Sequence, residues 1–314
     1  MRKRLFMLAA VFAAALCASA SSAPEQELPQ PIAAEVTSLA PGLVLCQFTY
    51  DDLFGGPQYV NMLEVDLNNP ELEIGIAVCA DKNRETTSGL GKRYHALAAI
   101  NFGYFMMSNP SNTACGLKYN GNTASAGMVG QGSGGVIAFT GNKVAFQTPE
   151  EFKPDEYENF RASFPLLVYR GAVYDKIGNY DHTLGRHPRT AVGIGQNNLL
   201  YLVTFDGRSK EHAIGVTCPE LAAYMRAIGC TDAINMDGGG STAMWTAAGG
   251  VVNHPSDNKK FDKDGERRVY DILYVRKKTD AAPEPAPVVQ PDQQQHPRIE
   301  KDPDQEVDKA RKAA

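Results

Sequence analysis

The chain has 314 residues, of which 43% are hydrophobic and 21% are charged, and its formal net charge is −5 at pH 7. A mildly acidic chain of this kind is a poor candidate for binding nucleic acid or an anionic membrane surface. Its six cysteines include no C-x-x-C pair, so the sequence indicates neither a zinc site nor a thioredoxin-type redox site.

Residues 1–23 have the features of a secretory signal peptide. Three basic residues form a positive start at 2–4, residues 5–16 are apolar, and small residues from Ala18 provide cleavage sites. The apolar stretch is too short for an ordinary membrane span. We therefore expect an exported protein, periplasmic or extracellular, with no membrane insertion after cleavage. Cleavage would change the net charge to about −8, from 28 basic and 36 acidic residues.

The rest of the chain divides into three segments by composition. Residues 24–41 are rich in Pro, Glu, Gln and Ala and are predicted to form a linker. Residues 42–278 suit a single domain. Residues 279–314 have too few apolar side chains to build a core and are predicted to be a disordered tail. Within the domain, Cys218 and Cys230 flank a predicted helix and could form a disulfide.

Strand patterns dominate the predicted domain. Runs rich in β-branched and aromatic residues, bounded by turn residues, predict strands at 43–50, 59–67, 72–79, 97–102, 136–140, 166–169, 190–195, 199–205 and 269–276. The polar segment 196–198 between two of these runs predicts a hairpin. The expected fold is α+β, a single domain with a large, mostly antiparallel or mixed β-sheet and a few packed helices.

One helix has clear start and end signals. Thr217 and Glu220 form a capping box, Pro219 lies in the first turn, and Gly229 stands where a C-terminal glycine is expected. Glu220 is therefore predicted to cap the helix rather than to act in catalysis. The helix leads into a short apolar run that ends at Asp237.

A glycine-rich turn follows this run. Its residues are Asp237, Gly238, Gly239, Gly240, Ser241 and Thr242. Glycines allow a sharp turn and a close approach to the backbone, so several N–H donors would stand beside one carboxylate. Such a turn suits an anionic or sugar ligand. The alternative is a hairpin capped by its aspartate, and this stretch alone supports both interpretations equally.

Other polar residues stand at the ends of predicted strands. Each of them alone has a structural explanation, such as a strand-end turn or a surface ion pair. They are Asn101, Arg189, Asp206, Arg208 and Arg267. Two histidines in a polar loop, His182 and His187, are expected to be solvated.

The strand ends predict that several of these residues meet. Asn101, Asp206 and Asp237 all follow apolar runs, so they are expected along one rim of the sheet. Arg189 precedes its strand and would lie beside the Asp206 end in an antiparallel hairpin. Carboxylates can act as nucleophile or base, and arginine binds phosphate with two parallel hydrogen bonds.

The motifs around these residues resemble the phosphodiester glycosidase domain family. In chain order they are Asn101-Phe-Gly-Tyr-Phe105, Arg189-Thr-Ala-Val-Gly193, Phe205-Asp-Gly-Arg208, Pro219-Glu-Leu221, Asn235-Met-Asp-Gly-Gly-Gly-Ser-Thr242 and Glu266-Arg267. The resemblance covers about 95–276, and the Asp-Gly-Gly-Gly-Ser-Thr element is its most specific part. Phe102 departs from the family, which commonly has glycine there. A bulky side chain at that position bears on the shape of the pocket and on the substrate.

The resemblance implies a glycosidase that hydrolyses a sugar-1-phosphodiester, of the N-acetylglucosamine-1-phosphodiester type, to free sugar and a phosphomonoester. A phosphomonoester leaves with little need for protonation, so the site is expected to bind the phosphate through arginine and backbone N–H groups. The catalytic carboxylate would be Asp237 or Asp206. The phosphate would be bound by Arg189, Arg208 and Arg267. Sugar or phosphate contacts would come from Asn101, Gly238, Gly239, Gly240, Ser241 and Thr242.

Three other interpretations compete. A non-catalytic carbohydrate-binding or cell-envelope polysaccharide scaffold protein would keep the turn and tolerate loss of Asp206 and Asp237. An actin-like ATPase needs a second Asp-Gly-rich hairpin, which nothing before residue 100 supplies. Ser241 as a hydrolase nucleophile lacks the G-x-S-x-G elbow.

No cofactor is expected. Asp237, Asp206 and Asn101 offer oxygen ligands of the kind that suits Ca²⁺ or Mg²⁺, although their spacing does not require a metal. The expected partner is a carbohydrate phosphodiester substrate, and no nucleic-acid partner is expected.

Overall fold

The computed structural model describes residues 28–79, 84–107, 113–125, 127, 134–179 and 181–278. The signal peptide predicted at 1–23 and the tail predicted at 279–314 lie outside these residues. Among the described residues, no helix is both long and apolar enough to cross a membrane.

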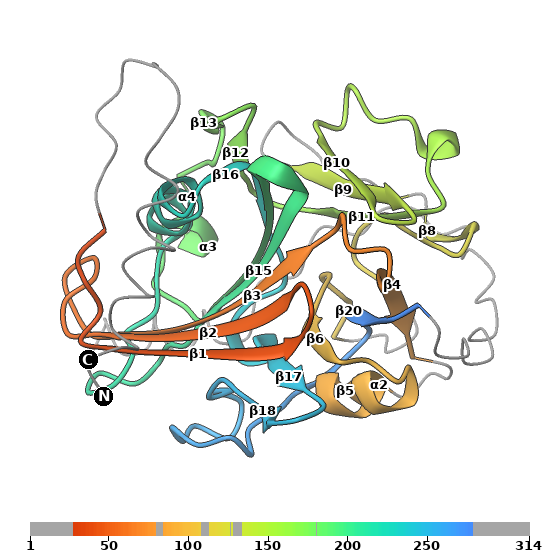
Figure 1. Ribbon diagram of the computed structural model, residues 1–314. Helices are drawn as coiled ribbons and strands as arrows, with labels where there is room; N and C mark the ends of the chain where they lie inside the picture. The colour runs from red at the N-terminus through yellow and green to blue at the C-terminus, as the bar shows by residue number, and fades with distance from the viewer. Residues whose placement is uncertain are drawn as a thin grey trace.

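The largest sheet has eight strands in the order β1-β2-β3-β15-β14-β16-β12-β13 (Figure 1). Its neighbouring strands are all antiparallel. The strands are Ala33–Ala40 (β1), Leu43–Tyr50 (β2), Gln58–Asp66 (β3), Leu166–Tyr169 (β12), Ala172–Val173 (β13), Arg189–Gly195 (β14), Leu199–Phe205 (β15) and Cys230–Asn235 (β16).

Two five-stranded sheets pack against this sheet, and a two-stranded ribbon completes the β-structure. One five-stranded sheet contains Lys143–Gln147 (β10), Gly135–Thr140 (β9), Asn159–Ser163 (β11), Leu117–Tyr119 (β7) and Asn122–Ser125 (β8), in that order. The other contains Gly250–Val251 (β18), Met244–Thr246 (β17), Ala98–Asn101 (β6), Asp271–Lys277 (β20) and Leu72–Val78 (β4). The ribbon pairs Arg268–Val269 (β19) with Glu85–Thr86 (β5).

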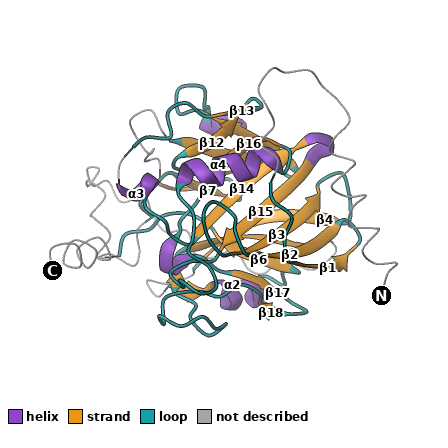
Figure 2. Ribbon diagram, turned by 90° about the vertical axis from the view of Figure 1, so that its left-hand side faces the viewer, coloured by secondary structure: helices purple, strands orange, loops and turns teal. Residues whose placement is uncertain are grey.

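The helices within the described residues are few and short. They are Thr87–Arg93 (α2), Asp181–Leu184 (α3) and Cys218–Ala227 (α4), with 3₁₀ turns at Pro154–Glu156 (η1), Gln196–Asn198 (η2) and Gly239–Ser241 (η3). The helix α4 lies across one face of the eight-stranded sheet, over β12, β14 and β16 (Figure 2). The helix α2 packs on β17, β6 and β20.

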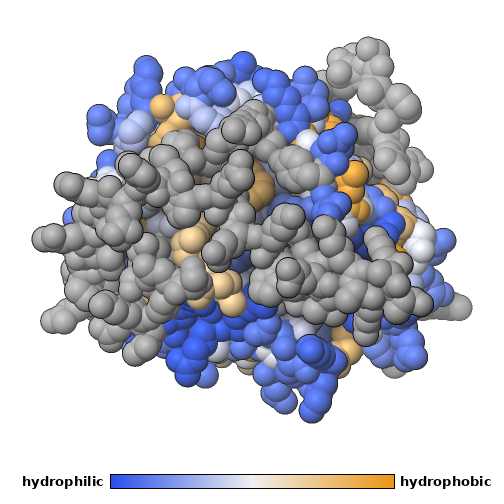
Figure 3. Space-filling model, turned by 180° about the vertical axis from the view of Figure 1, so that it is seen from behind, coloured by the Kyte–Doolittle hydropathy of each residue, from blue (hydrophilic) through white to orange (hydrophobic). Residues whose placement is uncertain are grey.

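Both faces of the central strands of the eight-stranded sheet are buried, because each face has its own partner layer. In β15, Leu200 and Leu202 belong to the core shared with the two five-stranded sheets. The alternate residues Tyr201, Val203 and Phe205 belong to a second core, which is completed by α4. Successive side chains of a strand point to opposite faces, so one strand serves both cores. On the face seen in Figure 3, the described surface is mostly hydrophilic, with apolar side chains in small groups.

The predicted α+β fold with mostly antiparallel strands is confirmed, although its strands divide among three sheets and a ribbon. The predicted hairpin is also confirmed, since β14 and β15 pair antiparallel on either side of η2. Eight of the nine predicted strands agree with observed strands to within one residue at each end, and the last begins two residues later than predicted. The strands β7 and β8 have only three and four residues, which is too short for a hydrophobic pattern to predict them.

The structure corrects one prediction and decides one alternative that the sequence left open. Residues 24–41 do not form only a linker, because Ala33–Ala40 is β1 and pairs with β2 through backbone hydrogen bonds. Its side chains are largely exposed, so the segment lacks the apolar alternation that marks a strand. The disulfide that Cys218 and Cys230 could have formed is not present, since Cys46, Cys79, Cys115, Cys218 and Cys230 are all free and buried.

The capping box of α4 is confirmed and gives a stability prediction. The Thr217 hydroxyl accepts a hydrogen bond from Glu220 N (3.2 Å), and the Glu220 carboxylate accepts one from Thr217 N (2.9 Å). We expect Thr217→Ala to lower the free energy of unfolding by about 1 kcal/mol, measured by urea denaturation. The matched control is Thr37→Ala on exposed β1, for which we expect a change within about 0.5 kcal/mol. Equal losses in both variants would show that the cap contributes nothing specific.

Candidate active site

The glycine-rich turn lies where two sheets meet. Asp237 follows β16 of the eight-stranded sheet, and Asn101 ends β6 of another sheet. Asp237 N donates to Phe102 O (3.0 Å), and Asn101 Nδ2 donates to Asp237 O (2.6 Å). The expectation that Asn101 and Asp237 share one rim is therefore confirmed.

Asn101 positions the turn instead of facing a ligand, which corrects its predicted role. Its side chain is fully buried, and its Oδ1 accepts hydrogen bonds from Thr190 Oγ1 (2.7 Å) and Ala243 N (3.0 Å). Thr242 is corrected in the same way, because it is 1% exposed and its hydroxyl accepts from Thr190 Oγ1 (3.4 Å). Both side chains hold the turn against its neighbours.

Phe102 also differs from expectation. It is 1% exposed and packs in the core between the sheets. Its bulk therefore fills the core and does not shape the pocket, while its carbonyl oxygen holds Asp237 N.

Asp237 is the carboxylate of the turn that keeps an approach from solvent. Its side chain is partly buried, and burial raises its pKa to about 7. The Ser241 hydroxyl, which bonds to the carboxylate, and the nearby Arg267 and Arg161 oppose this rise, while Asp271 adds to it. A carboxyl group with a pKa close to neutral can serve as base, acid or nucleophile at physiological pH.

Two guanidinium groups lie against the turn. A Cβ atom at Gly239, which has φ +60°, would stand 3.1 Å from an Arg208 amino group. A Cβ atom at Gly240 would stand 2.4 Å from an Arg267 amino group. The absence of a Cβ atom at these two glycines thus leaves room for both guanidinium groups, as they are placed, close to the backbone of the turn. Arg208 and Arg267 thus both lie at this turn, and their binding of a phosphate stays a prediction.

A segment that the sequence analysis did not single out holds these arginines. Arg267 donates to Asp257 Oδ1 from Nε (3.0 Å) and from an amino group (2.5 Å). Arg208 donates to Ser256 Oγ (3.4 Å). The signal in the sequence is a short Pro-Ser-Asp run with no hydrophobic pattern, which alone is too common to identify a site.

A third cation, Arg84, was also missed. It donates to Met106 O (2.5 Å) and Met107 O (3.0 Å), and its guanidinium lies 4.4 Å from the centre of the Phe105 ring. Burial lowers the pKa of Arg84, with Arg267 lowering it further and Asp237 raising it. Arg84 therefore lies close enough to contribute positive potential to the site.

Arg189 has another role than the predicted phosphate contact. Its backbone lies beside the end of β15, as expected, since it pairs with Phe205. Its side chain is 1% exposed and donates to the carbonyl oxygens of His182 (2.6 Å), Gly185 (2.9 Å) and Val216 (3.1 Å). These bonds fix the loop around α3, so we assign Arg189 a structural role.

Asp206 likewise holds a loop. It is fully buried and accepts hydrogen bonds from Asn253 Nδ2 (3.1 Å), His254 N (3.0 Å) and His254 Nδ1 (2.8 Å). Burial raises its pKa, and the bond to His254 opposes the rise. Asn253 Nδ2 also bonds to Thr242 O (3.1 Å), which ties this loop to the turn. These bonds position the loop at 253–254 against the turn, and the predicted catalytic role of Asp206 stays a prediction.

His182 is not solvated, contrary to expectation. Its Nε2 lies 2.9 Å from the Tyr104 hydroxyl, and burial lowers its pKa to about 3, so the ring is neutral. The Tyr104 hydroxyl accepts from Asn235 Nδ2 (2.9 Å), and its ring stacks on Phe164. Burial and Asp237 both raise the pKa of Tyr104, which places this network next to the catalytic candidate.

A buried ion pair supports the strand end that leads to the site. Arg161 Nε lies 2.9 Å from Asp271 Oδ2, and both side chains are fully buried. Asp271 Oδ1 accepts from Gly103 N (2.7 Å), and Arg161 donates to Tyr104 O (2.7 Å). A Cβ atom at Gly103 would stand 1.7 Å from Arg161 Nε, which explains the glycine. No sequence pattern predicts this pair, because Arg161 lies within β11 and Asp271 begins β20 without a motif to mark either residue.

The three oxygen ligands considered for a cation do not combine into a site. Asn101 and Asp206 use their side-chain oxygens within the protein, which leaves only Asp237. Among the described residues, no group of three or more His, Cys, Asp or Glu side chains could hold a metal ion.

The raised pKa of Asp237 predicts a pH-dependent stability difference. Between about pH 4 and 7 the folded protein keeps a proton that the unfolded chain has lost, so stability falls as the pH rises through this range. Asp237→Asn removes this cost. We expect its Tm to equal that of the wild type near pH 4 and to exceed it above pH 7, measured by thermal unfolding. A difference independent of pH would contradict the assignment, and exposed Asp175→Asn is the control.

Comparison with known proteins agrees with these motifs. A sequence model of the phosphodiester glycosidase family matches residues 94–276. The chain is 27% identical over 206 residues to N-acetylglucosamine-1-phosphodiester alpha-N-acetylglucosaminidase of Mus musculus, covering 59% of this chain and 38% of that protein. It is 26% identical over 202 residues to the Bos taurus protein of the same name, covering 57% of this chain and 36% of that one. The chain therefore spans less than half the length of these curated relatives.

Solved structures share the fold. The catalytic domain of the zebrafish enzyme of that name has a TM-score of 0.59 and 18% identity, covering 78% of this chain and 88% of that one. A putative exported protein from Burkholderia pseudomallei has a TM-score of 0.60 and 15% identity, and the match covers 82% of this chain and 100% of that one. A hypothetical protein from Synechocystis has a TM-score of 0.64 and 13% identity, and the match covers 77% of this chain and 63% of that one. With the family match extending over more than half of its length, the chain belongs to the phosphodiester glycosidase family.

Proposed function

We propose that the protein hydrolyses a sugar-1-phosphodiester to free sugar and a phosphomonoester, with Asp237 as the catalytic carboxylate. The observation that carries the proposal is the placement of Arg208 and Arg267 against the glycines that follow Asp237. Positive charge and a carboxylate with a pKa of about 7 thus share one turn. The relatives named N-acetylglucosamine-1-phosphodiester alpha-N-acetylglucosaminidase suggest the substrate class.

The arrangement assigns each group a step. Arg208 and Arg267 bind the phosphate, with Arg84 adding positive potential, and they stabilise the negative charge that the phosphate oxygen gains as the C–O bond breaks. Ionised Asp237 attacks the anomeric carbon or takes a proton from the attacking water. Ser241 keeps the carboxylate oriented through its hydrogen bond.

A single free carboxylate fits this leaving group. Most glycosidases need a second carboxyl group as a general acid, because a sugar alkoxide is a poor leaving group. Asp206 and Asp271, the other buried acids near the turn, are bonded within the protein. A phosphomonoester leaves without protonation, so the reaction does not require a second acid.

We also propose that the protein acts outside the cytoplasm, on the basis of the signal-like residues 1–23. A small phosphodiester or a phosphate-linked envelope polymer would both be available there. Cell fractionation with an antibody against the protein tests this location.

The reaction class is tested with a substrate panel. We expect turnover of N-acetylglucosamine-1-phosphodiesters or other sugar-1-phosphodiesters with a kcat/KM well above that of p-nitrophenyl glycosides, and no turnover of bis-p-nitrophenyl phosphate. The first control substrate lacks the phosphate, and the second lacks the sugar. Sugar binding without turnover of any sugar-1-phosphodiester would favour a carbohydrate-binding protein.

A further inference from the structure

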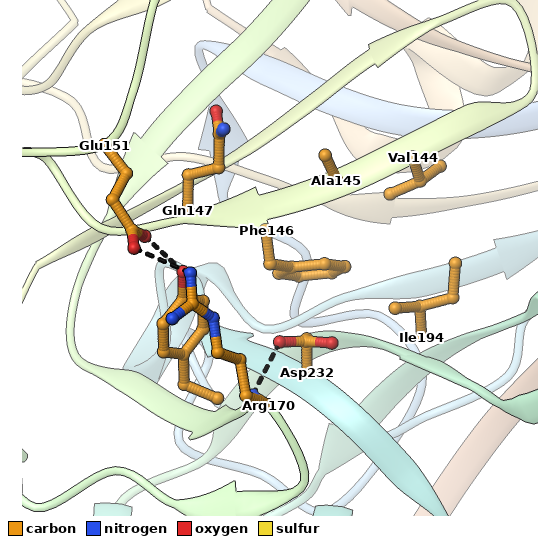
Figure 4. A pocket seen from close by; sticks show the side chains of 9 residues that line it. Val144, Ala145, Phe146, Gln147, Glu151, Arg170, Ile194 and Asp232 are labelled. Carbon is orange, nitrogen blue, oxygen red and sulfur yellow. Dashed lines mark hydrogen bonds and ion pairs between the residues drawn. The ribbon is translucent and has the colours of Figure 1, made fainter.

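A groove of about 470 Å³ lies away from the catalytic turn, between the β9–β10 hairpin and the far ends of β12, β14 and β16. Its apolar lining includes Val144, Phe146 and Ile194. Its polar lining includes Glu151, Tyr169, Arg170 and Asp232. Figure 4 shows the Glu151 carboxylate directed at the Arg170 side chain, with Asp232 below Phe146 and beside Ile194.

The polar groups of this groove are held in place by one another. The Tyr169 hydroxyl donates to Glu151 Oε2, and Arg170 donates to Glu151 Oε1 (2.7 Å). Arg170 N donates to Asp232 Oδ1 (2.9 Å), and the Arg170 guanidinium lies 4.9 Å from the centre of the Tyr169 ring. Hydrogen bonds therefore bring acceptors, donors and an aromatic ring together at the surface, where the Arg170 and Glu151 side chains are 72% and 38% exposed.

The backbone at Arg170 has a conformation that a tight turn rarely gives to an arginine. Arg170 and Gly171 connect β12 to β13 with φ of +51° and +80°. A two-residue turn of this kind favours Asn, Asp or Gly at its first position. An arginine at that position is strained, and strain of this kind gathers at functional sites.

The chemistry of the groove selects among ligand classes. Two carboxylates against one guanidinium leave a net negative charge, which opposes phosphates and nucleic acids. Two carboxylates are also too few for a metal site, in agreement with the absence of such a group among the described residues. Sugar hydroxyls donate to carboxylates and accept from guanidinium groups, and the apolar face of a sugar ring packs on aromatic and aliphatic side chains. A groove of this volume falls within the range of small-ligand sites.

We infer that this groove is a second, non-catalytic saccharide-binding site. Asp232 lies five residues before Asp237, with most of β16 between them, so the groove is roughly 16 Å from the catalytic turn along the strand. At that separation the groove cannot hold the reacting phosphodiester. It would instead hold another sugar unit of a polysaccharide, and it would do so whether or not the protein is a hydrolase.

The test is calorimetric titration of the full protein with N-acetylchitotetraose, cellotetraose and maltotetraose, none of which carries a phosphate. We expect at least one of them to bind with a Kd below about 1 mM. Arg170→Asn should weaken that binding roughly tenfold or more while keeping or raising Tm, because asparagine suits the turn. Asp232→Ala should weaken binding similarly.

Two further variants test whether saccharide binding is specific to this groove. Glu156→Gln removes a nearby exposed carboxylate outside the groove and should leave binding unchanged. Asp237→Asn should also leave binding unchanged, even if it abolishes hydrolysis, so the two proposals fail independently. The inference would be overturned by any of three results. These are no binding of any tetrasaccharide, wild-type affinity in both groove variants, and loss of binding in Asp237→Asn.

Discussion

Asp237→Asn is expected to reduce kcat/KM on a sugar-1-phosphodiester by roughly 10²–10⁴-fold, the range for losing a positioned acid–base group. A larger loss is expected if Asp237 is the nucleophile, because an amide cannot form the covalent intermediate. The substitution preserves shape, and the raised pKa of Asp237 indicates that a neutral side chain is tolerated there. The measurement is steady-state kinetics of purified variants, with Tm recorded alongside.

Two variants control this result. Asp206→Asn places an amide opposite Asn253 Nδ2 and His254 N, so we expect a lower Tm together with any loss of activity. Asp175→Asn changes an exposed carboxylate and should retain full activity. Full activity of Asp237→Asn, or a fall in Tm equal to that of Asp206→Asn, would remove Asp237 from the catalytic role.

Asp271→Ala is expected to give the largest loss of stability. It leaves Arg161 as an uncompensated charge in a site with no exposure, and breaking a buried pair in this way costs roughly 3–5 kcal/mol. The free energy of unfolding from urea denaturation measures the effect. The double variant Arg161→Met/Asp271→Leu should regain part of the loss, because neither charge then remains buried.

The matched comparison is an exposed ion pair. Lys153 Nζ lies 3.4 Å from Glu156 Oε1, and the two side chains are 74% and 55% exposed. Glu156→Gln should therefore change the free energy of unfolding by about 0–1 kcal/mol. Similar losses from Asp271→Ala and Glu156→Gln would show that the Arg161–Asp271 pair does not support the fold.

Strand ends could be predicted because hydrophobic periodicity marks where a strand stops. That reasoning correctly brought Asn101 and Asp237 together, and it placed Arg189 beside the end of β15. It could not predict side-chain direction, since a residue at a strand end can turn inward or outward. Arg189 and Asp206 turn inward, and their bonds to loops exist only in the folded chain.

Other residues of the site could not be predicted for a different reason. Arg161 and Asp271 are charged residues inside strands, where periodicity gives no reason to expect a buried ion pair. Arg84 lies before α2, and Asp257 lies in an irregular loop, so neither has a pattern to mark it. Their roles depend on contacts between distant parts of the chain.

The position of bond cleavage tests the central claim most directly. Hydrolysis of a sugar-1-phosphodiester in H₂¹⁸O, followed by mass spectrometry of the phosphomonoester, shows whether the C–O or the P–O bond breaks. Attack at the anomeric carbon, assisted by Asp237, predicts a phosphomonoester without ¹⁸O. Incorporation of ¹⁸O into the phosphomonoester would mean attack at phosphorus and would contradict the glycosidase mechanism.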